Sequence, residues 1–204
     1  MEIVNFKLNN VVVVIIIDPI NLQGISIDAL KEKGYAQIVV DPNAIIFKNS
    51  KGLESGLIQS VRLEFNSGGV KTFESKKFIS FIMRALNVIP KLSSKFLGIN
   101  YFANTNIRNE NNAGNYIKLN LLANGPKLEE KLNAPVISAA TRIIFGKQDD
   151  FLDIRLFPPK LEDPNLGIQF HSHKKITERK DIKEELERRL NSELDVFLNK
   201  LSVL

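Results

Sequence analysis

The sequence of 204 residues contains no cysteine, no tryptophan and only two histidines. Without cysteine the chain can form neither disulfides nor thiolate metal sites, so sulfur chemistry says nothing about its compartment. The sequence also lacks the phosphate-binding loops GxxxxGK[ST] and GxGxxG, and the GxSxG turn that presents a nucleophilic serine. These absences exclude the commonest nucleotide-binding and serine-hydrolase sites.

Long hydrophobic runs are also missing. The longest continuous β-branched stretch, Val11 to Ile17, has seven residues and ends at Asp18-Pro19. A helix that spans a bilayer needs about 20 apolar residues, and the acidic Glu2 does not suit a secretory leader. The sequence therefore predicts a cytoplasmic protein with no membrane segment. The run itself is typical of an interior strand covered on both faces.

The overall composition is that of a soluble globular protein, with 44% hydrophobic and 25% charged residues. A chain of this length buries about 70% of its unfolded surface, enough for one large domain or two fused half-domains.

Alternating side chains predict a sheet. Between Val136 and Phe157 two strands are predicted, joined by a polar turn at 146–150 in which Gly146 takes a positive φ. A similar pattern occurs earlier, with one strand at 44–48 and a second at 58–65. Further strands are predicted at 36–40, 96–102, 116–122 and 167–174.

Two long amphipathic helices are predicted, one from Ser75 to near Pro90 and one from Asp181 to about Leu201. Short helices are expected at 27–33, capped by Ser26 and closed by Gly34, and at 127–132. The last helix follows a predicted cap at Thr177, and its charged residues, Arg189 among them, are expected on its solvated side.

These elements repeat in the same order, which predicts two pseudo-repeated α+β halves, residues 1–95 and 96–204, fused into one domain. The expected fold class is α+β: an antiparallel sheet with the long amphipathic helices on one face. The duplicated saddle of the TATA-binding protein is one such arrangement, and this likeness of fold implies no function.

Three segments resemble a family of uncharacterised bacterial proteins that show an LGxRYxNxI pattern after a helix and an LDID-type strand before the last helix. The segments are VVDPNAIIFKNS (39–50), LGINYFANTNI (97–107) and FLDIRLF (151–157). This chain differs from the family pattern at Ile99, where a basic or polar residue is frequent, and at Arg155, where a second acid is frequent. The resemblance implies a fold and no established activity.

Positive charge is concentrated in one segment. Six basic residues and one acid lie between Lys71 and Lys95, an excess equal to the net charge of +5 for the whole chain. On the predicted helix, Lys77, Arg84 and Lys91 form a polar ridge. This ridge is either an ordinary solvated helix face or a nucleic-acid-binding patch.

His171 and His173, the two histidines, are two residues apart on one predicted strand, so both lie on the same face as Gln169, opposite Ile168 and Phe170. If that strand neighbours the one that carries Asp153, the three side chains could bind a metal ion or act as acid and base. The alternative is that they are polar residues on the wet side of a sheet.

Charged side chains also alternate on the predicted strands. Arg62 and Glu64 are expected at positions equivalent to Asp153 and Arg155, where cross-strand charge pairing accounts for them. The alternative is a recognition surface on the outward face of the sheet.

The interpretation that the sequence favours is a non-enzymatic binding or scaffold module that acts through protein contacts, with no cofactor. Its partner is an unknown protein or a second copy of the chain, as a homodimer. Nucleic-acid binding through Lys77, Arg84 and Lys91 is the second hypothesis. Arg62 and Arg155, on the outward face of the sheet, are further candidate binding residues for a partner protein or for nucleic acid. A metal-dependent enzyme at His171, His173 and Asp153 is the third.

Overall fold

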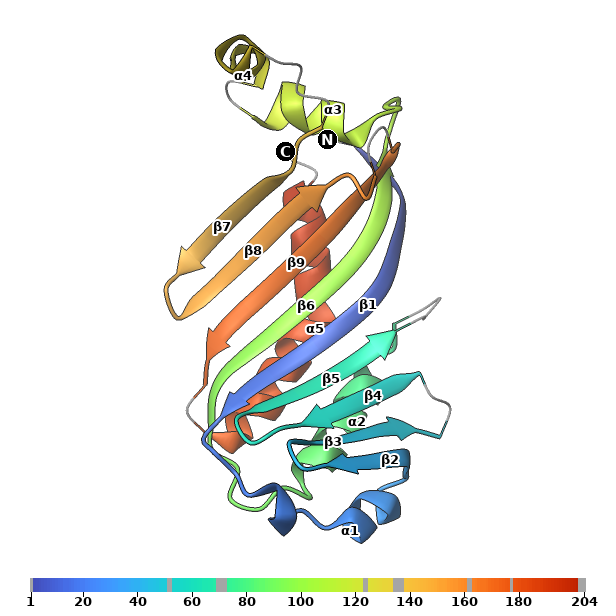
Figure 1. Cartoon of the computed structure of the whole chain (residues 1–204), viewed down its shortest axis with the longest axis vertical. Helices are drawn as coiled ribbons and strands as arrows, with labels where there is room; N and C mark the ends of the chain where they lie inside the picture. The colour runs from blue at the N-terminus through green and yellow to red at the C-terminus, as the bar shows by residue number, and fades with distance from the viewer. Residues whose placement is uncertain are drawn as a thin grey trace.

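The computed structural model of the chain describes residues 2–50, 53–68, 73–122, 125–133, 138–160, 163–176 and 178–201. Figure 1 shows a single large antiparallel sheet with helices packed against it. The α+β class and the antiparallel sheet predicted from the sequence are confirmed.

The sheet has nine strands in the order β2-β3-β4-β5-β1-β6-β9-β8-β7, and each neighbouring pair is antiparallel. The strands are β1 (Ile3–Ile17), β2 (Tyr35–Asp41), β3 (Ala44–Asn49), β4 (Glu54–Ile58), β5 (Arg62–Gly68), β6 (Ser94–Ile107), β7 (Thr141–Lys147), β8 (Asp150–Phe157) and β9 (Asn165–Lys175). The two longest strands, β1 and β6, lie side by side at the centre.

The helices are η1 (Leu22–Gly24), α1 (Ile27–Glu32), α2 (Ser75–Leu86), α3 (Ala113–Tyr116), η2 (Ile117–Leu121, a π-helix), α4 (Gly125–Leu132) and α5 (Arg179–Leu201). In Figure 1, α2 and α5 lie behind the sheet, and α3 and α4 lie beyond one end of it. No helix of the described residues covers the face of the sheet that is turned toward the viewer.

The core lies between the sheet and the two rear helices. Alternate residues of β1, from Val11 to Ile17, are at most 2% exposed, and the buried faces of α2 and α5 pack on the same layer. The side chains between them on β1, Val12, Val14 and Ile16, point the other way and are only half-buried. The expectation that Val11–Ile17 is covered on both faces was therefore wrong.

The early hairpin differs from its prediction. Residues 58–65 do not form one strand, because β4 ends at Ile58 and β5 begins at Arg62, and β4 separates β3 from β5. The sequence of β4 contains Gly56, a poor strand former. Here the ring of Phe47 lies over this glycine, where an added Cβ would come within 2.2 Å of the ring.

The predicted strand at 116–122 is helical, since α3 runs directly into η2 over that stretch. Its alternation of polar residues was fortuitous, and the only buried side chain of η2 is Ile117. Instead, β6 continues through the asparagine-rich segment as far as Ile107, beyond the predicted end at residue 102.

Several local predictions are confirmed. Ser26 caps α1 by accepting a hydrogen bond from the Ala29 amide, Gly34 closes the helix with a φ of 84°, and Gly146 has a φ of 123°. The helices α2 and α5 begin and end close to their predicted limits. The predicted cap at Thr177, and Lys71 of the basic segment, lie outside the described residues.

Candidate functional site

The face of the sheet that no helix of the described residues covers is called the open face. Cross-strand register places its central side chains in rows. One row runs Leu57, Glu64, Val14, Gly98, His173 and Phe151, and the next runs Ser55, Asn66, Val12, Asn100, His171 and Asp153. Ile16 and Phe96 lie beyond one row, and Phe102, Gln169 and Arg155 beyond the other.

The middle of the open face is apolar and aromatic. Val14, Phe96, Phe102 and Phe151 are half-buried although nothing in the described chain covers them. Sheet faces turned to water normally carry polar side chains at such positions. A contiguous apolar group on an uncovered surface is typical of an interaction site.

The rings of the open face form a stack. His173 lies between Phe151, with ring centroids 4.7 Å apart and planes at 18°, and Phe96, with centroids 5.0 Å apart. These separations equal the spacing between strands, so each ring turns its flat side to its neighbour and its edge to solvent. Both flat faces of His173 are therefore already occupied.

The second histidine is held by a hydrogen bond, because Nδ1 of His171 lies 2.9 Å from Oδ1 of Asn100. The amide oxygen can only accept, so this bond fixes the proton of the neutral ring on Nδ1. The ring leans over Gly98, where an added Cβ would lie 3.0 Å from the imidazole. Burial lowers the pKa of both His171 and His173, which favours the neutral rings.

Asp153 lies on the same row as His171 and is only 2% exposed, because two arginines cover it. Nε of Arg142 lies 3.0 Å from each of its carboxylate oxygens, and Nη2 of Arg142 lies 2.6 Å from Oδ2. Nη2 of Arg155 adds a longer contact of 3.4 Å. Burial alone would raise the pKa of Asp153, but the hydrogen bonds and charge of Arg142 lower it.

These contacts bear on the predicted metal site. The prediction that His171, His173 and Asp153 lie on one face of the sheet is confirmed by the register of β8 and β9. The carboxylate of Asp153, however, accepts hydrogen bonds from Arg142 and Arg155 and is therefore not free to bind a metal ion. Among the described residues, no group of three or more His, Asp or Glu side chains is placed to hold a metal ion.

Arg62 and Glu64 form a separate ion pair at 2.5 Å on β5. They do not occupy positions equivalent to Asp153 and Arg155, as the sequence had suggested. β5 adjoins the central strand β1, whereas β8 is separated from the central strand β6 by β9. The predicted cross-strand pairing holds on β8, where Arg142 of β7 contacts Asp153, but on β5 the pair lies within one strand. Arg62 and Arg155 each have an acidic partner.

The predicted basic ridge on α2 is largely occupied. Lys77 pairs with Glu74 at 2.6 Å, and Nη1 of Arg84 donates to the carbonyl oxygen of Lys33 at 2.9 Å at the end of α1. The guanidinium of Arg84 also lies over the Tyr35 ring. Lys91 lies past the end of the helix, with a φ of 50°. The three cations therefore do not form a continuous stripe along the helix.

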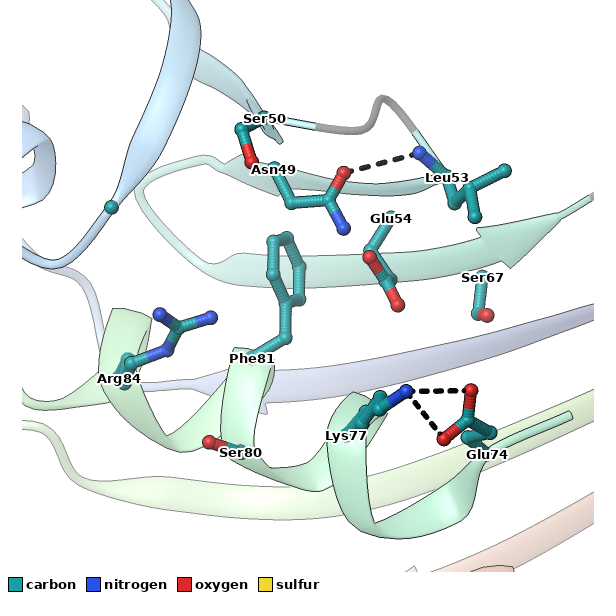
Figure 2. Close-up of a pocket in the computed structure, with 11 residues that line it drawn as sticks. Asn49, Ser50, Leu53, Glu54, Ser67, Glu74, Lys77, Ser80, Phe81 and Arg84 are labelled. Carbon is teal, nitrogen blue, oxygen red and sulfur yellow. Dashed lines mark hydrogen bonds and ion pairs between the residues drawn. The ribbon is translucent and has the colours of Figure 1, made fainter.

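Figure 2 shows that Lys77 and Arg84 face a groove between α2 and the neighbouring ends of β3 and β4. The groove has a volume of about 410 Å³ and a mixed lining of acids, cations and hydroxyls. The buried ring of Phe81 points from α2 toward the sheet, and Glu54 and Lys77 both lie to its right in the view. Because Lys77 is neutralised by Glu74 and Arg84 holds α1, this lining shows no preference for one ligand charge.

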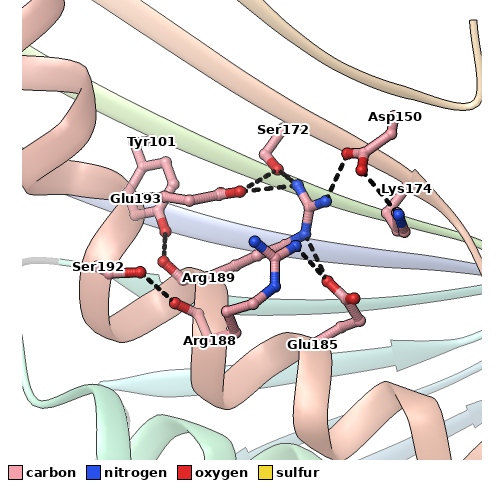
Figure 3. A network of polar contacts seen from close by, with 9 residues as sticks. All are labelled: Tyr101, Asp150, Ser172, Lys174, Glu185, Arg188, Arg189, Ser192 and Glu193. Carbon is pink, nitrogen blue, oxygen red and sulfur yellow. Dashed lines mark hydrogen bonds and ion pairs between the residues drawn. The ribbon is translucent and has the colours of Figure 1, made fainter. Parts of the chain in front are cut away.

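A polar network, shown in Figure 3, fixes α5 on the sheet. The side chain of Arg189, 2% exposed, donates to Glu185 at 2.9 Å, to Glu193 at 2.7 Å, to Asp150 at 2.7 Å and to the Ser172 hydroxyl. Sequence reasoning placed Arg189 on the solvated side of the helix, which is wrong. The centre of the network, Arg189 and Glu193, is buried, while Asp150 at its margin is 43% exposed. Every hydrogen-bonding nitrogen of Arg189 already has a partner, so the network holds the fold.

The open face contains residues that sequence reasoning missed. Phe96 and Phe102 belong to a strand in which apolar residues occupy both phases of the alternation, so the pattern did not show which phase faces out. Phe151 is at the start of β8, in the same phase as Asp153 and Arg155, and sequence reasoning assigned it no role. The pair of histidines is the signal that could have found them. It shows which side chains of β9 point outward, and the side chains paired with these on the neighbouring strands point outward too.

Comparisons with known proteins add no identity: no family model matches the chain, and a search of curated proteins finds no match. The resemblance to an uncharacterised bacterial family stays a prediction. Within the described ranges, no helix is both long and apolar enough to cross a membrane.

Proposed function

We propose that this chain is a non-enzymatic binding module that acts through protein contacts at its open face. The observation that carries the proposal is the half-buried group Val14, Phe96, Phe102 and Phe151 at the middle of an uncovered sheet. Around it lie charged and amide side chains such as Arg155. An aromatic centre with an arginine-containing rim is the usual anatomy of a protein–protein interface.

The same face suits nucleic acid less well. Proteins that bind single strands offer flat aromatic faces on which bases stack, together with cations free to contact phosphates. Here His173 is enclosed by rings on both sides, Arg142 is bound to Asp153, and Arg62 is bound to Glu64. The ridge on α2 has the same shortcoming, since Lys77 and Arg84 have partners.

We also propose that the two halves, 1–95 and 96–204, share one plan, with each closing helix on the rear of the sheet. The strand order supports this: outward from the centre it runs β1, β5, β4, β3 in one half and β6, β9, β8, β7 in the other, and β2 is an additional edge strand of the first half. Each half begins with its central strand and ends with a helix, α2 or α5. This plan places β5 opposite β9 and leaves one broad face for binding.

A photo-crosslinking experiment tests the proposed function. A benzophenone side chain is introduced in place of Phe102 on the open face, or, as the matched control, in place of Val196, which is 45% exposed on α5. We expect a protein adduct only from position 102, and we expect a Val14→Asp substitution in the same chain to abolish it. Adducts from position 196 alone, adducts to nucleic acid, or an adduct unaffected by Val14→Asp would contradict the proposal.

A further inference from the structure

We infer that the partner of the open face is a second copy of this chain, related by a two-fold axis that runs parallel to the strands between β1 and β6. This inference rests on the proposed function, because it names the occupant of the same surface. Two observations support it. The face is large enough for a stable dimer, and complementary side chains meet when a row of one copy is laid over the same row of the other copy in reverse order.

The size of the open face fits a stable dimer. From β3 to β7 the face crosses eight strands, about seven spacings of 4.8 Å, and from Phe96 to Phe102 it extends about 20 Å. The product is roughly 700 Å² for each copy, close to the roughly 800 Å² that a stable interface takes from each partner. Two sheets with the same twist also pack face to face, at about 30° and about 10 Å apart.

Reversal of the central row produces complementary contacts. The row reads Leu57, Glu64, Val14, Gly98, His173 and Phe151. A two-fold axis between β1 and β6 places β5 of one copy over β9 of the other, and β4 over β8. Glu64 then faces His173 of the other copy, an acid against an imidazole. Leu57 faces Phe151, an apolar pair.

The centre of the interface matches in the same way. Val14 of one copy faces Gly98 of the other, which has no side chain to oppose it, and Ile16 faces Phe96, an apolar pair across the axis. A two-fold axis across the strands would instead set β5 against β5 and β9 against β9. Such an arrangement brings like side chains together, and like charges that face each other are destabilising.

The absence of cysteine makes a direct test possible, because a single introduced thiol reacts alone. Chains with Glu64→Cys are mixed with chains with His173→Cys and treated with a short bifunctional thiol reagent. In the mixed dimer the two thiols lie about 10 Å apart, whereas Glu64→Cys alone places them about 17 Å apart, since three strand spacings of about 4.8 Å separate them laterally. The second Glu64–His173 pair of the mixed dimer keeps its natural residues.

We expect the mixture to give a product of twice the 23.0 kDa chain mass, about tenfold more than either variant alone. Asp195→Cys, on the exposed side of α5, is the control and should give none. Light scattering of the unsubstituted chain should show the same doubled mass and does not depend on any substitution.

Other outcomes separate the two proposals. Like-with-like crosslinking as efficient as mixed crosslinking would overturn the two-fold arrangement. A monomer at every concentration, together with a Phe102 photo-adduct to a different protein, would overturn the second copy as partner and leave the proposed function standing. A monomer with no photo-adduct would overturn both.

Discussion

The two large helices are fixed to the same sheet by different chemistry. Behind β2–β5, α2 packs through a cluster of aromatic rings, with Arg84 at its margin over the Tyr35 ring. Behind β6–β9, α5 adds a buried arginine and its carboxylates to its apolar contacts. The contrast separates two tasks, because apolar burial supplies stability wherever shapes fit, while a hydrogen-bonded charge network is satisfied in one position only.

On the α2 side, Phe81 is at the centre of the cluster and is 1% exposed. Its ring centroid lies 5.1 Å from Tyr35, 5.9 Å from Phe47, 6.3 Å from Phe65 and 6.4 Å from Phe78. The Tyr35 hydroxyl donates to the Phe81 carbonyl oxygen, so the one polar atom of the cluster is satisfied.

On the α5 side, Arg189 takes the central place. The Tyr101 hydroxyl donates to its carbonyl oxygen at 3.2 Å, and Phe170 stacks on Phe197 with centroids 4.3 Å apart beside the network. One atom remains unsatisfied, because Oε2 of Glu193 is buried without a hydrogen-bond partner among the described residues. This side therefore carries a desolvation cost that the aromatic side does not.

The largest expected loss of stability comes from the aromatic side. Phe81→Ala should lower the free energy of unfolding by about 4 kcal/mol, since it removes a ring and leaves a cavity among four others. The matched control Phe81→Leu should cost about 1 kcal/mol. Urea unfolding measures both, at one protein concentration. Equal losses for the two variants would contradict the account of this cluster.

The next effect is on the ionic side. Arg189→Met should cost about 3 kcal/mol, because Glu193 is left buried and uncompensated. Asp150 remains paired with Lys174 at 2.7 Å, and Glu185 remains paired with Arg188 at 2.6 Å, so each of these two acids still has a basic partner.

Adding Glu193→Leu to Arg189→Met should bring the unfolding free energy back to within about 1 kcal/mol of the natural chain. This rescue has no counterpart on the aromatic side. A double variant as unstable as Arg189→Met alone would show that the network contributes more than mutual compensation of its charges.

The pH dependence of stability should distinguish the two sides as well. Burial raises the pKa of Glu193, against the opposing charge of Arg189. The folded protein therefore binds this proton more tightly than the unfolded chain does. The stabilisation is complete below the ordinary pKa of 4.5 and is lost as pH rises through the higher folded value.

Glu193→Gln removes this dependence, so its unfolding free energy should improve relative to the natural chain as pH rises above 4.5. The two histidines act in the opposite direction, because burial lowers their pKa and stability falls as pH drops below 6.5. His171→Asn with His173→Asn, in both backgrounds, removes their contribution. If the difference in unfolding free energy between the natural chain and Glu193→Gln does not change with pH, the raised pKa of Glu193 is contradicted.

The smallest expected effects are on the open face, where the two sides also differ. Arg142→Gln should raise the pKa of Asp153, because the hydrogen bonds from Arg142 offset the burial that would otherwise raise it. Removing Arg62 from its ion pair with Glu64, which is exposed to solvent, should change stability very little. A carboxyl NMR titration of Asp153 measures the first. An unchanged pKa would show that Arg155 suffices to hold this carboxylate.

Much of the fold could be predicted from periodicity. The limits of α2 and α5, the outward phase of β9 and the turn at Gly146 were all visible, because one-sided burial imposes a repeat on the sequence. The strand β4 was not visible, since its glycine is acceptable only under the Phe47 ring, a contact made by another strand. The π-helical turn at 117–121 was mistaken for a strand because its polar residues alternate by chance.

The candidate site was harder to predict than the fold. Val12, Val14 and Ile16 are apolar although they lie on the open face, and they therefore looked like core residues. Arg189 looked like a surface residue for the converse reason, since its partners Asp150 and Ser172 come from strands distant in the chain. In both cases the sequence shows the chemistry of a residue but not the element that lies opposite it.

The most direct test of the central claim compares the open face in cells with the open face of dilute purified protein, by radical footprinting of side chains. Phe96, Phe102 and Phe151 should be labelled in the dilute protein and protected in cells, while Val196 on α5 is labelled equally in both. The account would be contradicted if the phenylalanines of the open face were labelled equally in both settings and protection were confined to Val39 and Val40 on the exposed edge strand β2.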